Sequence, residues 1–571
     1  MTWKPWLGAV PGAEGTHFRV WAPKANSLSV KILGGPTVPL LRDDDGYFTG
    51  RADGVRAGAR YFYRFPDGRE RPDPASLLQP ESVHGPSEIV DLAAIAPRSL
   101  RARVPLEKLI FCEIHLGTYT EEGTADAAAR YMPELAEGLF TAVEVMPVAA
   151  FAGNRNWGYD GVAPFAAHAA YGGPAALARL VDAAHKSGLS AFLDVVYNHL
   201  GPEGNYLGEF GPYFTAKHKT PWGDALDFSL APVRRYFVEN ALRWVSRAGG
   251  GFDGLRLDAV HGIYDDSSKH ILQEIADAVH AEGGIVIAES DLNDVKLIEQ
   301  YHLDGSWADD LHHALHVALT GESQGYYGDF QDPLPQMVAA LERGWYYEGQ
   351  HKPSFGRKHG TPAAHLRARH FVVCAQNHDQ IGNRAQGERL TALTDTGGVR
   401  AVAAVLALQP ALPLYFQGEE WGAREPFQYF VSHTDQGLVE AVRKGRQEEF
   451  KGFTWTDVPD PFSEETFARS RIERGRKDAE ALAWHRALLK LRREHPALQD
   501  DSRKGLRASA QGKTLLMRRG PLLVAAAFDP GPSEARLPEG RWRVLLDSGA
   551  SALEGDRLRF RGRGAVVLEH G

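Results

Sequence analysis

The chain has 571 residues, of which 43% are hydrophobic and 24% are charged, and its formal net charge is −9. This length predicts several domains, or one large domain with attachments. Nucleic acid and anionic membrane surfaces are not expected as partners, because phosphate binding requires clustered Lys and Arg and the sequence has no basic stripe. No apolar run reaches about 18 residues, so we expect no membrane-spanning segment.

Cysteine usage and the first residues predict the compartment. Cys112 and Cys374 are the two cysteines, and this count excludes a secreted disulfide framework. Each lies in an apolar run, where a buried free thiol is the usual state. The opening Met-Thr-Trp-Lys-Pro lacks the basic start and apolar stretch of a signal peptide. We therefore expect a soluble cytoplasmic protein.

Both ends of the chain show the period-two alternation of short β-strands. In residues 1–95 the alternation runs over 16–22, 28–32 and 61–65, separated by Gly, Pro and Asp turns. In residues 497–571 it returns over 515–518, 522–527, 542–546 and 565–568. We predict an N-terminal β-sandwich, resembling a carbohydrate-binding module, and a small C-terminal β-sandwich.

Residues 96–496 have a different rhythm, in which short apolar runs alternate with amphipathic helices. One helix is predicted from about Pro174 to Gly188, and another carries Val233, Phe237, Ala241 and Trp244 on one face. Buried strands alternating with helices predict a parallel sheet, and eight such units favour a closed (β/α)₈ TIM barrel. The eight candidate strands are 109–113, 142–148, 190–197, 252–258, 285–289, 305–309, 371–376 and 412–416.

Polar residues end several of these strands, where barrel enzymes place their catalytic groups. Asp258, Glu289 and Asp379 follow strands four, five and seven. Arg256 lies two residues before Asp258, so both side chains point to one face and the cation favours an ionised carboxylate. Glu289 would lie near this second anion, which raises its pKa and suits a proton donor. A lone strand-end Asp is usually a turn or cap residue, but independent caps would not supply this set.

Four short segments resemble the signatures of the α-amylase superfamily, glycoside hydrolase family 13. They are residues 194–199, 254–261, 288–290 and 377–379, in the family's order and spacing. The resemblance implies that Asp258 is the nucleophile, Glu289 the acid/base, and Asp379 a carboxylate that stabilises the transition state. It also implies a retaining mechanism through a covalent glycosyl-enzyme.

Further motifs resemble the branch of this family that releases trehalose from trehalose-capped malto-oligosaccharides. They are residues 156–161, 212–214, 220–224, 309–316, 376–384 and 418–423, with Leu311 and Gln417 as departures from the expected Phe and Met. The resemblance implies an oligosaccharide substrate and functional coupling to the enzyme that forms trehalose-capped chains. The expected substrate-binding residues are Tyr159, His199, Arg256, His261, Asp309, Asp310, His312, His313, Asn377, His378, Gln380 and Asn383.

No cofactor and no required metal are expected. Asn198 lies where some relatives bind calcium, but nothing nearby clearly supplies six or more oxygen ligands. Several aromatics are candidate platforms for sugar rings. The cluster of Trp345, Tyr346 and Tyr347 stands out, because three adjacent large aromatics are not expected to face one core.

Three alternatives stay open. A glycogen branching or debranching enzyme would share the domain order and the catalytic triad but would form or cut α-1,6 bonds. A non-catalytic glucan-binding protein on the same barrel would have lost Asp258 or Glu289, and both are present. The N-terminal domain is either a sugar-binding module or a packing domain that shapes the cleft.

Overall fold

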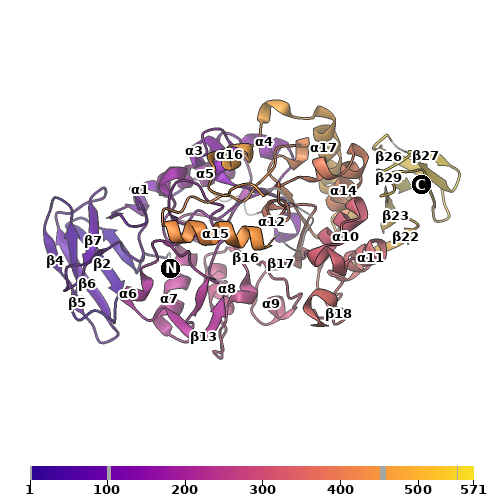
Figure 1. The fold of residues 1–571 in the computed structure, drawn as a ribbon. Coiled ribbons are helices and arrows are strands. Elements are labelled where there is room, and N and C mark those ends of the chain that lie inside the picture. The colour runs from indigo at the N-terminus through magenta and orange to yellow at the C-terminus, as the bar shows by residue number, and fades with distance from the viewer. Residues whose placement is uncertain (1–2, 100–103, 221, 450–457, 550) are drawn as a thin grey trace.

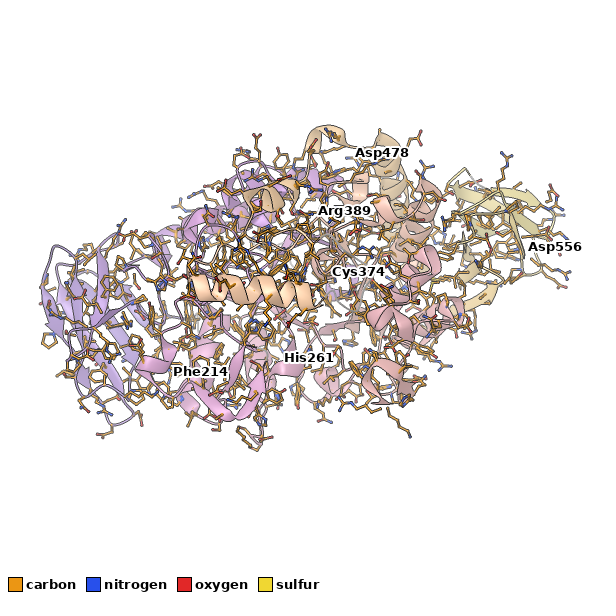
Figure 2. The ribbon with its side chains drawn as sticks, viewed as in Figure 1. Phe214, His261, Cys374, Arg389, Asp478 and Asp556 are labelled. Carbon is orange, nitrogen blue, oxygen red and sulfur yellow. The ribbon has the colours of Figure 1, made fainter. Side chains whose placement is uncertain are left out.

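The computed structural model describes residues 3–99, 104–220, 222–449, 458–549 and 551–571. Pro221, within the 220–224 motif, lies outside these ranges. The molecule is elongated, with N-terminal sheets at the left of Figure 1, a central barrel, and C-terminal sheets at the right. Figure 2 shows the same view with side chains, and places Cys374 and Arg389 in the middle and Asp556 at the far right. Within the described ranges, no helix is both long and apolar enough to cross a bilayer.

Eight parallel strands close into the predicted barrel, each within or at one of the predicted segments. Closure is made by the first and last strands, with Phe111 opposite Leu414. The sixth strand has three residues and is the shortest. In spatial order the strands are β10 (Phe111–Ile114), β11 (Ala142–Val145), β12 (Ser190–Val195), β15 (Gly254–Leu257), β16 (Ile285–Ala288), β17 (Gly305–Trp307), β20 (Phe371–Cys374) and β21 (Leu412–Phe416).

Helices cover the outside of the barrel. The predicted helix near Pro174 is α5 (Gly173–Lys186), and the chain leaves it through Gly188 at φ 80°, a left-handed conformation that glycine adopts without strain. The next predicted helix is α7 (Ala231–Val245), which buries Val233, Phe237 and Trp244. Other helices on this ring are α8 (Ile271–Ala281), α10 (Asp310–Thr320), α11 (Pro333–Arg343), α14 (Thr396–Leu408) and α17 (Ala479–Glu494).

Side chains that point into the barrel change from apolar to charged along the strands. A buried cluster fills the lower barrel, and it includes Phe111, Phe192, Ile287, Val372 and Leu414. Because successive side chains of a strand alternate between faces, the inward position two residues later lies nearer the C-terminal rim. On the first four strands these inward positions are Glu113, Glu144, Asp194 and Arg256, all at most 2% exposed. The strand pattern therefore delivers ionisable side chains to the barrel mouth.

The N-terminal part is a sandwich of two antiparallel sheets. Phe18 of one sheet meets Tyr61 of the other edge to face, with ring centroids 5.0 Å apart. Trp21 packs against Tyr213 of the barrel part at 5.0 Å, so the sandwich is fixed to it by aromatic contact. The first sheet is β1 (Gly8–Pro11), β2 (Gly15–Trp21), β6 (Tyr47–Asp53) and β5 (Leu41–Arg42); the second is β4 (Thr37–Pro39), β3 (Ser29–Ile32), β7 (Arg60–Arg64) and β8 (Glu70–Arg71), with β9 (Ser87–Glu88) beside β7.

The C-terminal part is a second, smaller sandwich. Leu523 and Ala525 of one sheet share a core with Leu558 and Phe560 of the other. Its larger sheet contacts α14, and α11 contacts the edge strand β22. The larger sheet is β22 (Leu506–Gln511), β23 (Thr514–Arg519), β24 (Leu522–Ala527), β29 (Gly564–His570) and β26 (Trp542–Asp547); the smaller is β25 (Ser533–Arg536), β28 (Arg557–Phe560) and β27 (Ser551–Glu554).

Arg492 of α17 ties this end of the molecule to the barrel. Its guanidinium donates to the carbonyl oxygens of Ala407, Gln409 and Ala411 at 2.8, 2.6 and 2.7 Å, between the end of α14 and the start of β21. We expect R492M to destabilise the protein by roughly 2–4 kcal/mol, because buried carbonyls lose their donors. Calorimetry should show a lower thermal midpoint for R492M, whereas R493M, a change at the exposed neighbour, should not lower it. Equal midpoints for R492M and R493M would contradict this role.

Candidate active site

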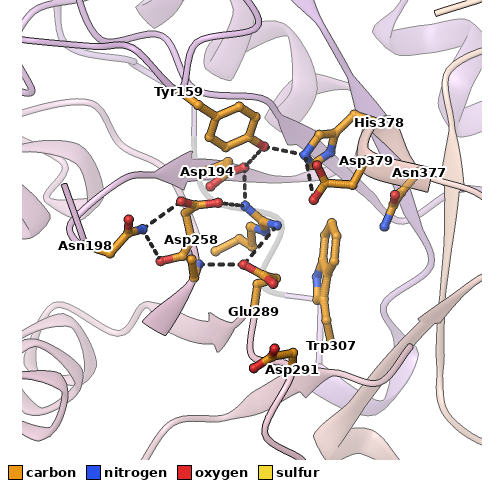
Figure 3. A network of polar contacts seen from close by, with 12 residues as sticks. Tyr159, Asp194, Asn198, Asp258, Glu289, Asp291, Trp307, Asn377, His378 and Asp379 are labelled. Carbon is orange, nitrogen blue, oxygen red and sulfur yellow. Dashed lines mark hydrogen bonds and ion pairs between the residues drawn. The ribbon is translucent and has the colours of Figure 1, made fainter. Parts of the chain in front are cut away.

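Three carboxyl side chains meet at the C-terminal mouth of the barrel (Figure 3). Asp258 directly follows β15, and Glu289 directly follows the neighbouring strand β16. Asp379 lies in the first turn of α12 (His378–Gly382), after β20. The register of parallel strands places Leu257 beside Ala288, so the residues that follow them are neighbours.

Arg256 lies beneath these carboxyls and is fully buried. Its Nη1 is 2.7 Å from Asp194 Oδ2 and 3.0 Å from Asp258 Oδ1, and its Nη2 is 3.8 Å from Glu289 Oε2. The guanidinium also lies over the ring of Trp307, 4.2 Å from the centroid. One cation therefore touches both predicted catalytic carboxyls, which brings Asp258 and Glu289 to a common cavity.

Asp258 is held by hydrogen bonds suited to an anion. Asn198 donates from Nδ2 to the carboxylate at 2.7 Å and to the backbone oxygen of Asp258 at 2.8 Å. With Arg256 on the other oxygen, both carboxylate oxygens have a polar partner. Ionised carboxylates are the effective nucleophiles, because the protonated form has no free charge to offer.

Glu289 is placed by an unusual turn. Ala259 adopts the left-handed conformation at φ 38°, a costly backbone state for a residue with a Cβ. This turn directs the Ala259 N–H to Glu289 Oε2 at 2.6 Å. Burial, followed by the charges of Asp258 and Asp379, raises the pKa of Glu289 to about 8 against the opposing effect of Arg256. Glu289 therefore carries a proton at neutral pH.

Asp379 is the most accessible of the three, with 42% of its side chain exposed. The short helix that carries it begins at Asn377, whose Oδ1 accepts a hydrogen bond from the Gln380 N–H at 2.9 Å. His378 Nε2 and Asn383 Nδ2 each lie 3.5 Å from the Asp379 carboxylate. Three of the predicted substrate-binding residues thus position Asp379 or its helix.

His199 and Tyr159 form one wall of the cavity. His199 Nε2 is 2.9 Å from the backbone oxygen of Tyr159, and the ring stacks on Trp222 with centroids 3.6 Å apart. Trp222 is itself 49% exposed, so its outer face is open to a ligand. The Tyr159 hydroxyl donates to Asp194 at 2.6 Å and lies 2.7 Å from His378 Nε2.

The predicted stretch 309–313 divides into two groups. Asp309 lies near Asp379, and burial followed by that charge raises the pKa of Asp309 to about 7. His313 is partly exposed and packs near Tyr326, with centroids 4.8 Å apart. In contrast, Asp310 Oδ2 accepts from Asn293 Nδ2 and from the backbone N–H groups of residues 346 and 347, and His312 is 1% exposed. These last two residues support the cavity from behind.

Two more predicted residues lie at the rim. His261 Nδ1 is 3.5 Å from Asp291 Oδ1, and Gln380 accepts a hydrogen bond from the Tyr326 hydroxyl at 3.3 Å. The expectation for the aromatic cluster was wrong in part. Trp345 and Tyr347 are each 2% exposed, because the helix α11 and the following loop give both of them a core to pack in. Tyr346 is half-buried.

Glu113 and Lys352 are among the residues of the site that were absent from the sequence-based set. Glu113 is a buried partner of His378, and Lys352 has an Nζ with no hydrogen-bond partner in the part of the chain that the structure describes. Lys352 lies between the rings of Phe355 and Tyr347, at 4.5 and 5.4 Å. The alternation rule could have found Glu113, which ends a predicted strand on its inward face. Lys352 sits on the short hairpin β18 (His351–Lys352) and β19 (Arg357–Lys358), for which the sequence carries no strong signal.

The described residues contain no group of three or more His, Cys, Asp or Glu side chains placed to hold a metal ion. Asn198, the residue considered for calcium, instead bonds Asp258. A closed parallel barrel with two carboxyl side chains, Asp258 and Glu289, on one buried Arg at its mouth is the arrangement of an α-amylase-type glycoside hydrolase.

Comparison with known proteins agrees with this class and narrows it. No protein-family model matches the chain. The malto-oligosyltrehalose trehalohydrolase of Saccharolobus solfataricus is 44% identical over 490 residues, spanning 84% of this chain and 86% of its own. That of Deinococcus radiodurans is 43% identical over 532 residues, spanning 90% and 87%. The chain belongs to the malto-oligosyltrehalose trehalohydrolase family.

Solved structures confirm the fold. A Salmonella typhimurium crystal structure, described as a candidate alpha amylase, superposes with a TM-score of 0.92 at 35% identity and covers 100% of both chains. A pullulanase of Paenibacillus barengoltzii superposes with a TM-score of 0.73 at 21% identity, covering 99% of this chain and 94% of its own. The barrel with flanking β-domains is therefore a shared architecture, as predicted.

The raised pKa of Glu289 predicts the alkaline side of the pH profile. Below about pH 8 the carboxyl is protonated and can donate; above it the proton is lost, so kcat/KM should fall as pH rises through that region. E289Q, which keeps the size but cannot donate, should lower kcat by about 10²–10⁴-fold. A pH–rate series on the parent and E289Q checks both points. An alkaline limb that stays unchanged in E289Q would contradict the assignment.

Proposed function

We propose that the protein hydrolyses the α-1,4-glucosidic bond next to the terminal trehalose unit of malto-oligosyltrehalose, releasing trehalose and a shorter malto-oligosaccharide. The observation that carries the chemistry is the contact of one buried guanidinium, that of Arg256, with both Asp258 and Glu289. The substrate assignment is supported by sequence identities of 36–44% to proteins that carry this name.

The proposed reaction is a double displacement with retention at the anomeric carbon. Asp258 attacks that carbon while Glu289 gives its proton to the glycosidic oxygen, so the bond to the leaving trehalose breaks and a glycosyl-enzyme ester forms. Glu289, now ionised, takes a proton from water, and the resulting hydroxide attacks the same carbon and releases Asp258. Retaining enzymes hold the two carboxyls about 5–5.5 Å apart, and the shared Arg256 contact is in keeping with such a pair.

The remaining residues divide between the two sides of the bond. Asp379 binds sugar hydroxyls in the transition state and thereby stabilises it. The sugar unit that forms the ester with Asp258 is surrounded by Tyr159, His199, Arg256 and His378. Asp309, His313, Gln380, Asn383 and His261 offer hydrogen bonds on the side of the leaving trehalose, with Lys352 as a further donor. Asn377, Asp310 and His312 hold these groups in place. A site that bonds particular hydroxyls strongly rejects sugars that lack them.

We divide the chain into an N-terminal domain (1–95), a catalytic domain (96–496) and a C-terminal domain (497–571). The aromatic contact of Trp21 with Tyr213 favours a packing role for the N-terminal domain. Cys112 and Cys374 are buried free thiols, as is usual in a reducing compartment, so a cytoplasmic enzyme is proposed. Its substrate would come from an enzyme that forms malto-oligosyltrehalose.

Product analysis tests the substrate. Maltotriosyltrehalose should yield trehalose and maltotriose, and maltopentaose at the same concentration should be cleaved far more slowly, because it lacks the capped end. Chromatography of both mixtures gives the products directly. A branching enzyme would instead create α-1,6 bonds, visible by proton NMR, and that outcome would overturn the proposal.

Asp258 is tested by D258N. The amide keeps the hydrogen bond from Arg256 but cannot attack, so we expect turnover to fall by at least about 10³-fold without loss of folding. The parent thermal midpoint, compared with that of D258N, separates lost chemistry from lost structure. Near-parent hydrolysis by D258N would remove Asp258 from the role of nucleophile.

A further inference from the structure

A buried ion pair lies beneath the catalytic cavity, and it joins His378 to Glu113, which is outside the predicted set of site residues. Glu113, on the inward face of β10, places Oε1 2.5 Å from His378 Nδ1, and its Oε2 accepts the His378 backbone N–H at 3.0 Å. Both side chains are 1% exposed. A charge so deeply buried costs free energy unless an opposite charge lies beside it. Glu113 and His378 therefore each need the other as a partner within the barrel.

The pair continues as a chain of contacts to the nucleophile (Figure 3). His378 Nε2 lies 2.7 Å from the Tyr159 hydroxyl, which donates to Asp194 at 2.6 Å. Asp194 and Asp258 then share Arg256 Nη1, at 2.7 and 3.0 Å. His378 Nε2 also lies 3.5 Å from Asp379. A state with both ring nitrogens protonated fits these partners: Nδ1 donates to Glu113, Nε2 donates to Tyr159, and Tyr159 keeps its proton for Asp194.

We propose that Glu113 is a positioning residue for this reaction, which fixes the ring of His378 and keeps it positively charged beneath Asp379. The mouth gathers Asp258, Asp309 and Asp379 around the protonated Glu289, and acidic groups so close together are stabilised by cations beside them. Arg256 and His378 are the cations that touch this acidic group. Glu113 therefore acts through His378 to keep a positive charge beside Asp379 and the Tyr159–Asp194 pair. The inference rests on the proposed glycosidic chemistry but not on the identity of the leaving sugar.

The groups that face His378 support this role. Glu113 approaches from β10, Tyr159 from the loop after β11, Arg256 from β15, and Asp379 from its own helix; Asp194, Glu144 and His115 complete the titratable surroundings. Burial opposes charge on the ring, but the carboxylates of Glu113 and Asp379 raise the pKa of His378 to about 9. Without the Glu113 charge, the effect of burial is less opposed and the pKa of His378 should fall. The ring should then lose its proton at a lower pH.

E113Q removes the charge of the Glu113 side chain and keeps its size and shape. A glutamine amide can accept the His378 backbone N–H through its oxygen and donate to Nδ1 through its nitrogen, so a neutral ring keeps its place. The matched control is E144Q. Glu144 is the register partner of Glu113 on β11, it is equally buried, and neither of its carboxyl oxygens has a hydrogen-bond partner within the described ranges. Burial, followed by the charge of Glu113, raises the pKa of Glu144 well above its usual value, so glutamine resembles its neutral form.

The experiment compares pH profiles of kcat/KM for the parent, E113Q, E113D and E144Q, with thermal midpoints recorded for each. The E113Q-to-parent ratio should be about 0.1 or lower at pH 8 and should rise towards 1 near pH 5, where a neutral ring regains its proton. E113D keeps the charge and should retain more activity at pH 8 than E113Q. E144Q should follow the parent at every pH. If E113Q fails to fold, the comparison of E113D with E144Q still decides: the shorter side chain of E113D holds its charge farther from His378 Nδ1 and should shift the alkaline limb part of the way, whereas E144Q should not shift it.

A double variant tests whether Glu113 acts through His378. E113Q added to H378N should cause little further loss, because the ring that Glu113 charges is already absent. A ratio that does not change with pH, an equal shift in E144Q, or additive losses in the double variant would each overturn the proposal. All ratios use one substrate, so the proposal is judged apart from the substrate assignment. Should the parent cleave only uncapped malto-oligosaccharide, the same series is run on that sugar.

Discussion

The structure depends on a guanidinium that is buried at the centre of a barrel. Arg256 has no exposed surface, and isolating such a charge from water costs several kcal/mol unless anions surround it. Asp194 and Asp258 supply those anions, and Trp307 covers the remaining face. Carboxylates that are crowded at a barrel mouth likewise need a cation beside them. The carboxyls of the proposed active site and the packing of the upper barrel are thus held together by the same ion pairs.

Unequal neighbours give two similar carboxyls different surroundings, in keeping with the different roles proposed for them. Asp258 receives Arg256 at 3.0 Å and the Asn198 amide at 2.7 Å, so each of its carboxylate oxygens has a donor. Glu289 receives the same Arg at 3.8 Å and a backbone N–H, and it is surrounded by other acids. At Glu289 the effect of burial outweighs that of Arg256, so its pKa is raised and the carboxyl keeps its proton at neutral pH. Separation of nucleophile and acid by environment is a general device of glycoside hydrolases.

Segments far apart in the chain complete the mouth. The short helix α12 is capped by its own Asn377 and is also contacted by α15 (Gln436–Glu449), which crosses in front of the barrel in Figure 1. Arg446 of α15 donates to the Gly382 carbonyl at 3.2 Å, at the end of the helix that carries Asp379. From below, Glu113 holds His378, the first residue of α12. Asp379 is therefore positioned from two sides by residues more than 60 positions away in sequence.

The sequence by itself determined the order of elements and the positions of the three carboxyls that were predicted to be catalytic. Strand alternation and polar residues at strand ends are local features, so they can be recognised in the sequence alone. The eight strands and the positions of Asp258 and Glu289 could therefore be predicted from them. Only the tertiary structure decided which side chains form hydrogen bonds and ion pairs with one another. Glu113 meets His378 across 265 positions. Lys352, on a short hairpin, places its ammonium near the rings of Phe355 and Tyr347. Trp345 is buried although its large aromatic neighbours in sequence had suggested an exposed position. Such outcomes depend on distances between strands that only barrel closure sets, because electrostatic and packing energies follow separation in space.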